Sequence, residues 1–185
     1  MSLEAIETEL KAKIGDQSVS EIDEIPFNNY EEFLELHKSN QIKIGVQYDG
    51  DLVTYFGSKG EVIMHTILVC SPLFISLALV VLAIFTSNYL ILCGIPLTLL
   101  GFILSSPFFM KGIGSAITFW GFIAFVYFCF KNLTIANLIG SYIFSNFFTT
   151  VAREQCRMIV HETILKSELV FIWIYMRGII NIQRI

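Results

Sequence analysis

The chain has 185 residues, of which 55% are hydrophobic, only 15% are charged and 17 are Phe. Ordinary soluble domains carry about 25% charged residues, so this composition excludes that class, and its apolar content excludes a disordered chain. The length allows one compact unit, or a membrane domain with a small appendage.

The charged residues divide the chain into three blocks. Residues 1–61 carry 13 of the 16 acidic side chains and 5 of the 12 basic ones, and residues 62–152 contain no Asp or Glu. Residues 153–185 carry 3 acidic and 5 basic side chains. The sequence therefore predicts an acidic head, a membrane domain and a mildly basic tail.

The head is predicted to contain two helices and a β-hairpin. A charged segment opens the chain, and a second helix follows Asn28-Asn29, where an Asn cap precedes acidic residues in the first turn. Apolar and polar residues then alternate on the way to Asp49-Gly50. This pattern predicts a hairpin over residues 41–56, because a type I′ turn requires positive φ at both central positions.

Four apolar stretches follow the head. A helix needs about 20 apolar residues to cross the ~30 Å hydrocarbon layer. We therefore expect spans at residues 62–86, 89–110, 113–130 and 133–152. The fourth carries several polar residues, so a helix lying in the membrane interface is its alternative.

Positive residues beside the spans predict the orientation. With four spans and the head inside, five basic residues flank the inner side and one the outer: Lys59, Lys111, Arg153, Arg157 and Lys166 inside, Lys131 outside. Both termini are therefore expected in the cytoplasm, at a bacterial inner membrane or an organelle membrane. Three spans with the head outside form the alternative topology.

The tail, residues 153–185, is predicted to form a helix and then a second hairpin. Its apolar run Leu169–Met176 is too short to span a membrane, and its β-branched and aromatic residues favour a strand. An isolated hairpin is marginal in water, whereas more strands with a shared apolar face can be stable. We expect the two hairpins to combine into one cytoplasmic sheet; a tail helix on the membrane surface is the alternative.

Enzyme signatures are missing from the sequence. His161-Glu162 begins like a zinc-binding helix, but Leu165 stands where the second His is required. The three His residues lie in separate segments and the four Cys residues form no CxxC pair. We expect no catalytic residue, metal site or cofactor. The acidic head argues against nucleic-acid binding and leaves room for a small cytoplasmic ligand.

Small residues recur at helical spacing within the second and third spans. They are Gly94, Thr98, Gly101 and Ser105, followed by Gly114, Thr118 and Gly121. Such spacing places small residues on one helix face, where neighbouring backbones can approach closely. We expect these faces to pack helices together.

The fourth span carries a more polar stripe. Its members are Thr134, Asn137, Ser141, Ser145 and Thr149. The stripe fits either a pore lining in a homo-oligomer or a helix-packing face, because amides such as Asn137 and Asn146 are costly in contact with lipid. Below it, Arg153 and Arg157 are candidates for binding lipid headgroups, although ordinary positive-inside anchoring explains them equally well.

Together these patterns predict an α-helical polytopic membrane protein with four transmembrane helices. A small α+β cytoplasmic domain would be built from the N- and C-terminal segments. We expect a non-enzymatic protein that self-associates into a channel or pore-like effector gated by this domain. The alternative is an accessory or scaffold subunit of a larger membrane complex, with the bilayer and other membrane subunits as partners.

Overall fold

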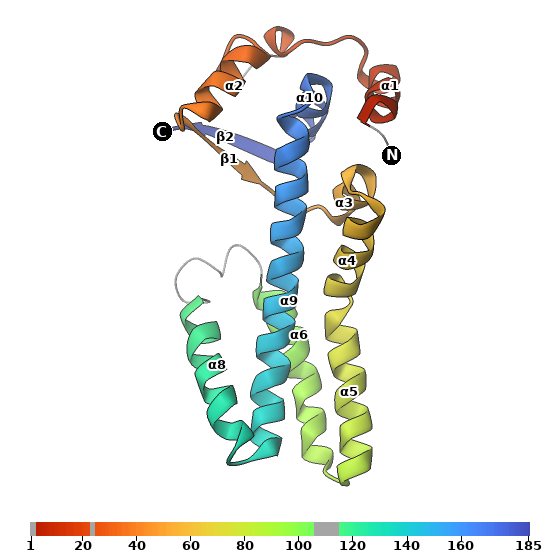
Figure 1. Ribbon diagram of the computed structural model, residues 1–185, viewed down its shortest axis with the longest axis vertical. Coiled ribbons are helices and arrows are strands. Elements are labelled where there is room, and N and C mark those ends of the chain that lie inside the picture. Colours follow the sequence, from red (N-terminus) through yellow and green to blue (C-terminus); the bar gives the residue numbers. More distant parts are fainter. Residues whose placement is uncertain (1–2, 23–24, 106–114) are drawn as a thin grey trace. The chain divides into compact units, whose positions relative to one another are not determined.

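The computed structural model describes residues 3–22, 25–105 and 115–185 (Figure 1). The chain divides into two compact units. The first unit comprises Met1–Ile63 together with Glu154–Ile185, and the second comprises Met64–Arg153. Helices dominate the described residues, which also hold one two-stranded sheet. The two ends of the chain thus fold together, as the sequence predicts.

The first unit opens with three helical elements: α1 (Leu3–Ile14), the short 3-10 helix η1 (Val19–Glu21) and α2 (Tyr30–Lys38). The predicted Asn cap of α2 is confirmed. The Asn29 side chain accepts a 2.8 Å hydrogen bond from the backbone N–H of Glu32. The Glu32 carboxylate in turn accepts one of 2.8 Å from the N–H of Asn28. These reciprocal bonds satisfy donors that a helix start leaves without partners.

The predicted hairpin over residues 41–56 is wrong in its second half. Strand β1 (Ile42–Val46) forms, but α3 (Gly50–Phe56) replaces the returning strand. Asp49 has an extended backbone and caps α3 by accepting a hydrogen bond from the N–H of Asp51 at 3.1 Å. An Asp before Gly suits a helix cap as well as a turn, and the helix buries Leu52 and Val53 completely.

The predicted tail hairpin is also wrong, because Leu169–Met176 belongs to helix α10 (Glu168–Met176). Four side chains of α10 are fully buried: Val170, Phe171, Ile172 and Ile174. A helix that is apolar on all sides fits the centre of a domain. Strand β2 (Ile180–Arg184) follows α10 and pairs antiparallel with β1 (Figure 1). The pairing of head with tail is therefore confirmed, with one strand from each.

The core of the first unit contains a pair of aromatic rings in contact. Phe33 of α2 and Phe171 of α10 are fully buried, with ring centroids 4.7 Å apart. The same core includes Cys156, Val160 and Ile164 from the C-terminal part of α9 (Leu133–Ile164) and buried aliphatic residues of α1, α3 and α10.

The second unit is helical throughout its described residues. Helix α4 (Lys59–Val69) enters it and is followed by α5 (Ser71–Thr86), η2 (Tyr89–Cys93), α6 (Gly94–Leu104), α8 (Ser115–Cys129) and α9. The axes of α4 and α5 differ by 48°. Pro72, in the first turn of α5, explains this break because proline has no N–H to continue the α4 hydrogen-bond ladder.

Only α9, among the described helices, is long and apolar enough to cross a membrane by itself. The bent pair α4–α5 makes a second such segment if it counts as one span. Helices α6 and α8 have 11 and 15 residues, or about 16 and 22 Å, which is short of the ~30 Å hydrocarbon layer. The described helices therefore do not support four complete transmembrane helices.

Candidate functional site

The polar stripe of α9 lies inside the second unit. Ser141, Ser145 and Thr149 are all buried. The Ser145 hydroxyl donates a 2.7 Å hydrogen bond to the backbone carbonyl of Thr98 on α6, which is itself buried. The Thr149 hydroxyl donates to the Ser145 carbonyl within its own helix. These hydroxyls are thus used inside a single chain.

Two glycines allow α6 to approach its neighbours. A Cβ added to Gly101 would overlap the backbone carbonyl of Tyr142 on α9. One added to Gly94 would lie 2.8 Å from a methyl carbon of Leu79 on α5 and 3.1 Å from the Ser141 hydroxyl. Ser105 is also buried, but its hydroxyl donates to the Phe102 carbonyl in its own helix. Small size at these positions therefore lets backbones meet.

Asn146 joins three helices. Its side chain is 2% exposed, and its amide nitrogen donates a 3.3 Å hydrogen bond to the carbonyl of Gly101 on α6. Its amide oxygen accepts a 3.2 Å bond from the Thr118 hydroxyl on α8. The spacing of the stripe passes over Asn146, although the cost of placing an amide in lipid indicates that it should be buried.

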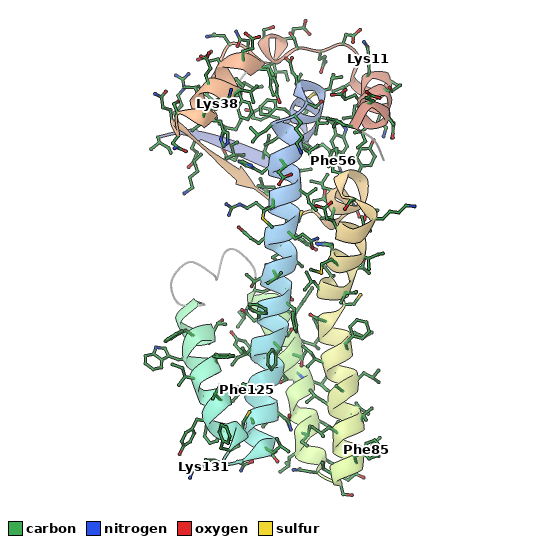
Figure 2. All side chains as sticks on the ribbon, in the orientation of Figure 1. Lys11, Lys38, Phe56, Phe85, Phe125 and Lys131 are labelled. Carbon is green, nitrogen blue, oxygen red and sulfur yellow. The ribbon has the colours of Figure 1, made fainter. Side chains whose placement is uncertain are left out.

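Glycines and aromatic rings make the contact between α8 and α9. A Cβ on Gly121 would come within 2.9 Å of Ile143, and one on Gly140 within 2.8 Å of Phe125. Phe125 packs edge-on against Phe144 of α9, with ring centroids 5.2 Å apart (Figure 2). Gly114 lies outside the described residues.

At the N-terminal end of the stripe, not every polar side-chain atom has a hydrogen-bond partner among the described residues. The Thr134 hydroxyl accepts a 2.7 Å hydrogen bond from the Asn88 side chain, next to η2. The Asn137 side chain is half-buried, and its amide nitrogen has no hydrogen-bond partner among the described residues. Asn137 is therefore the member of the stripe that has an unused donor.

The outer surface of the second unit is apolar. Phe85, at the end of α5, is 84% exposed, and large apolar side chains project from every helix (Figure 2). Examples are Leu73, Leu77 and Ile84 on α5, Leu99 and Ile103 on α6, Phe119, Trp120 and Tyr127 on α8, and Phe147 on α9. The exposed layer is thus more apolar than the buried small and polar residues beneath it.

The two arginines proposed for lipid headgroups differ in exposure. Arg157 is exposed and forms a 3.2 Å ion pair with Glu154 on the same helix. Arg153 is half-buried. Both arginines lie in the C-terminal half of α9, and the structure identifies no ligand for either of them.

The first unit contains a cavity of about 250 Å³. Its lining includes Phe56, Ser58, Glu61, Ile159, Glu162 and Lys166. The Ser58 side chain and backbone N–H bond the Glu61 carboxylate and lower the pKa of that group. Lys166 lies 3.5 Å from Glu162. The charged groups of the cavity are thus already engaged with protein partners.

Tertiary folding also brings His37 and His161 into contact, with ring centroids 5.0 Å apart. The sequence shows no relation between them, because α2 and α9 are distant along the chain. The described residues contain no group of three or more His, Cys, Asp or Glu side chains that could hold a metal ion.

Comparison with protein-family models, curated proteins and solved structures finds no match for this chain.

Proposed function

We propose that this chain is a non-enzymatic integral membrane protein that serves as an accessory or scaffold subunit of a membrane complex. The second unit would lie in the bilayer, with α4–α5, η2–α6, α8 and α9 belonging to four crossings. The first unit, formed by both ends of the chain, would lie in the cytoplasm and carry the contacts with soluble partners.

The reversed polarity of the second unit carries this proposal. Its buried positions include Thr98, Ser105, Ser145 and Asn146, while Phe85 and Trp120 are among its most exposed side chains. In water the hydrophobic effect favours the opposite arrangement. In lipid, helices gain little from burying large apolar groups and associate instead through small residues and interhelical hydrogen bonds.

The packing of α6 against α9 supports a scaffold rather than a pore. Ser141, Ser145 and Thr149 would have to face a water path for the stripe to line a channel. Instead they are buried, and Ser145 bonds Thr98 within the same chain. A helix bundle closed by such contacts can present a fixed outer surface to neighbouring subunits.

Membrane integration and orientation can be tested with single cysteines. In a background lacking Cys70, Cys93, Cys129 and Cys156, the variants Thr86→Cys, Lys131→Cys and Lys38→Cys are labelled with a membrane-impermeant maleimide. Four spans with a cytoplasmic head predict labelling of positions 86 and 131 from outside and of position 38 only after permeabilisation. Release of the chain by alkaline carbonate would contradict membrane integration, and external labelling at position 38 would support the three-span topology.

The scaffold role can be tested by size in mild detergent. Co-migration of the chain with other membrane subunits is the expected result. A monodisperse complex containing this chain alone would contradict it. Liposomes containing the purified chain should show no ion flux above that of empty liposomes.

Self-association into a channel is a second candidate, and the unused donor of Asn137 favours it. An amide without a partner in lipid costs free energy, and a second copy or a water-filled path could supply the acceptor. This candidate predicts ion flux from liposomes that is lost in Asn137→Leu. Flux that is absent, or that is unchanged by Asn137→Leu and Ser141→Leu, would contradict it.

A further inference from the structure

Two imidazoles from distant parts of the sequence meet in the first unit. His37 lies in the last turn of α2, and His161 lies near the C-terminal end of α9. Their ring centroids are 5.0 Å apart and their planes are inclined by 65°, and both side chains are half-buried. The described residues add no third metal-ligating group to this pair, and imidazole is the side chain whose ordinary charge change falls between pH 5 and 8.

The charges around His161 oppose a proton on its ring. Burial has the largest effect in lowering the pKa of His161, followed by the neighbouring His37 and by Arg157, one turn earlier on α9. The charge of Glu162 raises the pKa of His161. The Glu162 carboxylate also lies 3.5 Å from the Lys166 ammonium group. Acidification drives a proton onto the His161 ring, and this places a positive charge beside Arg157 at the contact.

We propose that the His37–His161 contact is an acid-sensitive latch, which holds the C-terminal turn of α2 against α9 at neutral pH and releases it on acidification. This contact lies within the first unit, so the proposal does not depend on how the second unit meets the membrane. The latch would give the first unit a conformational response to proton concentration.

The structure limits how far the release can extend. The other end of α2 is held by Phe33 in the aromatic core and by the Tyr30 hydroxyl, which donates a 2.6 Å hydrogen bond to the Ile164 carbonyl. Beyond His37 the chain turns through Asn40, which has φ of +55°, into β1. Acidification should therefore loosen the C-terminal turn of α2 and the start of β1. Helix α10 should stay packed in the core of the unit.

Hydrogen exchange of the full chain tests the latch. Exchange is measured at pH 7.5 and pH 5.0 and corrected for the intrinsic effect of pH. Amides of residues 36–44 are expected to exchange about three- to tenfold faster at pH 5.0, the size that repulsion between part-exposed like charges produces. Amides of residues 170–174 should keep their protection.

Three variants separate the latch from general acid sensitivity. His161→Phe keeps an aromatic ring but cannot take a proton, so its exchange at residues 36–44 should no longer respond to pH. His37→Gln should also abolish the response, and in it the pKa of His161 should rise, as followed by NMR of the imidazole carbon. His65→Gln removes the remaining histidine, which lies in the second unit, and should leave the response unchanged.

Two results would overturn the proposal. The first is an acid response at residues 36–44 that persists in both His161→Phe and His37→Gln. The second is equal loss of protection at residues 36–44 and 170–174, since this would mean that acid unfolds the whole unit rather than one contact.

Discussion

The Ser145 hydroxyl on α9 donates a 2.7 Å hydrogen bond to the Thr98 carbonyl on α6, and both residues are fully buried. The acceptor is a backbone oxygen that already serves the helix ladder, so the bond adds an interhelical link without breaking α6. Interhelical bonds of this kind contribute about 0.5–1.5 kcal/mol. This pair fixes α9 to α6 at the centre of the stripe.

Removing the Ser145 hydroxyl should weaken the second unit. Ser145→Ala is expected to lower its free energy of unfolding by about 0.5–1.5 kcal/mol, measured by titration with denaturing detergent. Ser76→Ala is the matched control, because the Ser76 hydroxyl bonds the Pro72 carbonyl within α5. Equal losses in the two variants would show that the link between α6 and α9 adds no stability.

Adding one methyl group should have opposite effects at two helical glycines. Gly101→Ala would force a Cβ against the Tyr142 carbonyl and is expected to destabilise the second unit by about 1–3 kcal/mol. A Cβ at Gly60 in α4 meets nothing within 4 Å. Gly60→Ala should therefore raise helix stability by up to about 1 kcal/mol. Thermal unfolding of both variants checks the signs, and a stabilising Gly101→Ala would contradict the close approach of α6 and α9.

The two environments of phenylalanine can be distinguished by truncation. Phe171→Ala removes a fully buried ring in contact with Phe33 and should cost the first unit about 3–5 kcal/mol. Phe85→Ala removes a ring that is 84% exposed and should change stability by less than about 0.5 kcal/mol. Protease sensitivity and near-ultraviolet circular dichroism measure the stability of both variants. A large effect of Phe85→Ala would show that a protein partner covers this position.

Alkaline conditions should destabilise the first unit through Tyr30. Burial, followed by the charges of Glu168 and Glu7, raises the pKa of Tyr30 to about 12. The folded state therefore holds this proton more tightly than the unfolded state, whose tyrosine pKa is about 10. The resulting stability is fully present below pH 10 and is lost as the pH rises through about 12.

The variant Tyr30→Phe tests this source of alkaline sensitivity. It should be less stable at pH 7.5, since it loses the hydrogen bond to the Ile164 carbonyl, and its stability should depend less on pH above 10. Tyr55, whose pKa burial and Glu9 also raise to about 12, retains part of the dependence. Denaturation at pH 8, 10 and 11 measures the slope. An unchanged slope in Tyr30→Phe together with Tyr55→Phe would contradict the assignment.

The sequence alone predicts those structural features that depend on residues close to one another in the chain. The Asn29 cap depends on donors within one helical turn, and the glycine spacing of α6 depends only on the helix period. The partition of charge likewise separated a head-and-tail unit from an apolar unit, because ionised groups remain in water. The structure divides the chain into Met1–Ile63 with Glu154–Ile185 and Met64–Arg153.

Only the tertiary structure decided features that depend on distant partners. A run of eight apolar residues fits a strand or a buried helix equally well, and Leu169–Met176 becomes helical where Val170, Phe171, Ile172 and Ile174 can be buried in the core of its unit. Asp49-Gly50 caps α3 because Leu52 and Val53 have a core to enter. The contact of His37 with His161 joins α2 to α9. Such choices depend on burial against segments far away in the sequence, which local patterns do not encode.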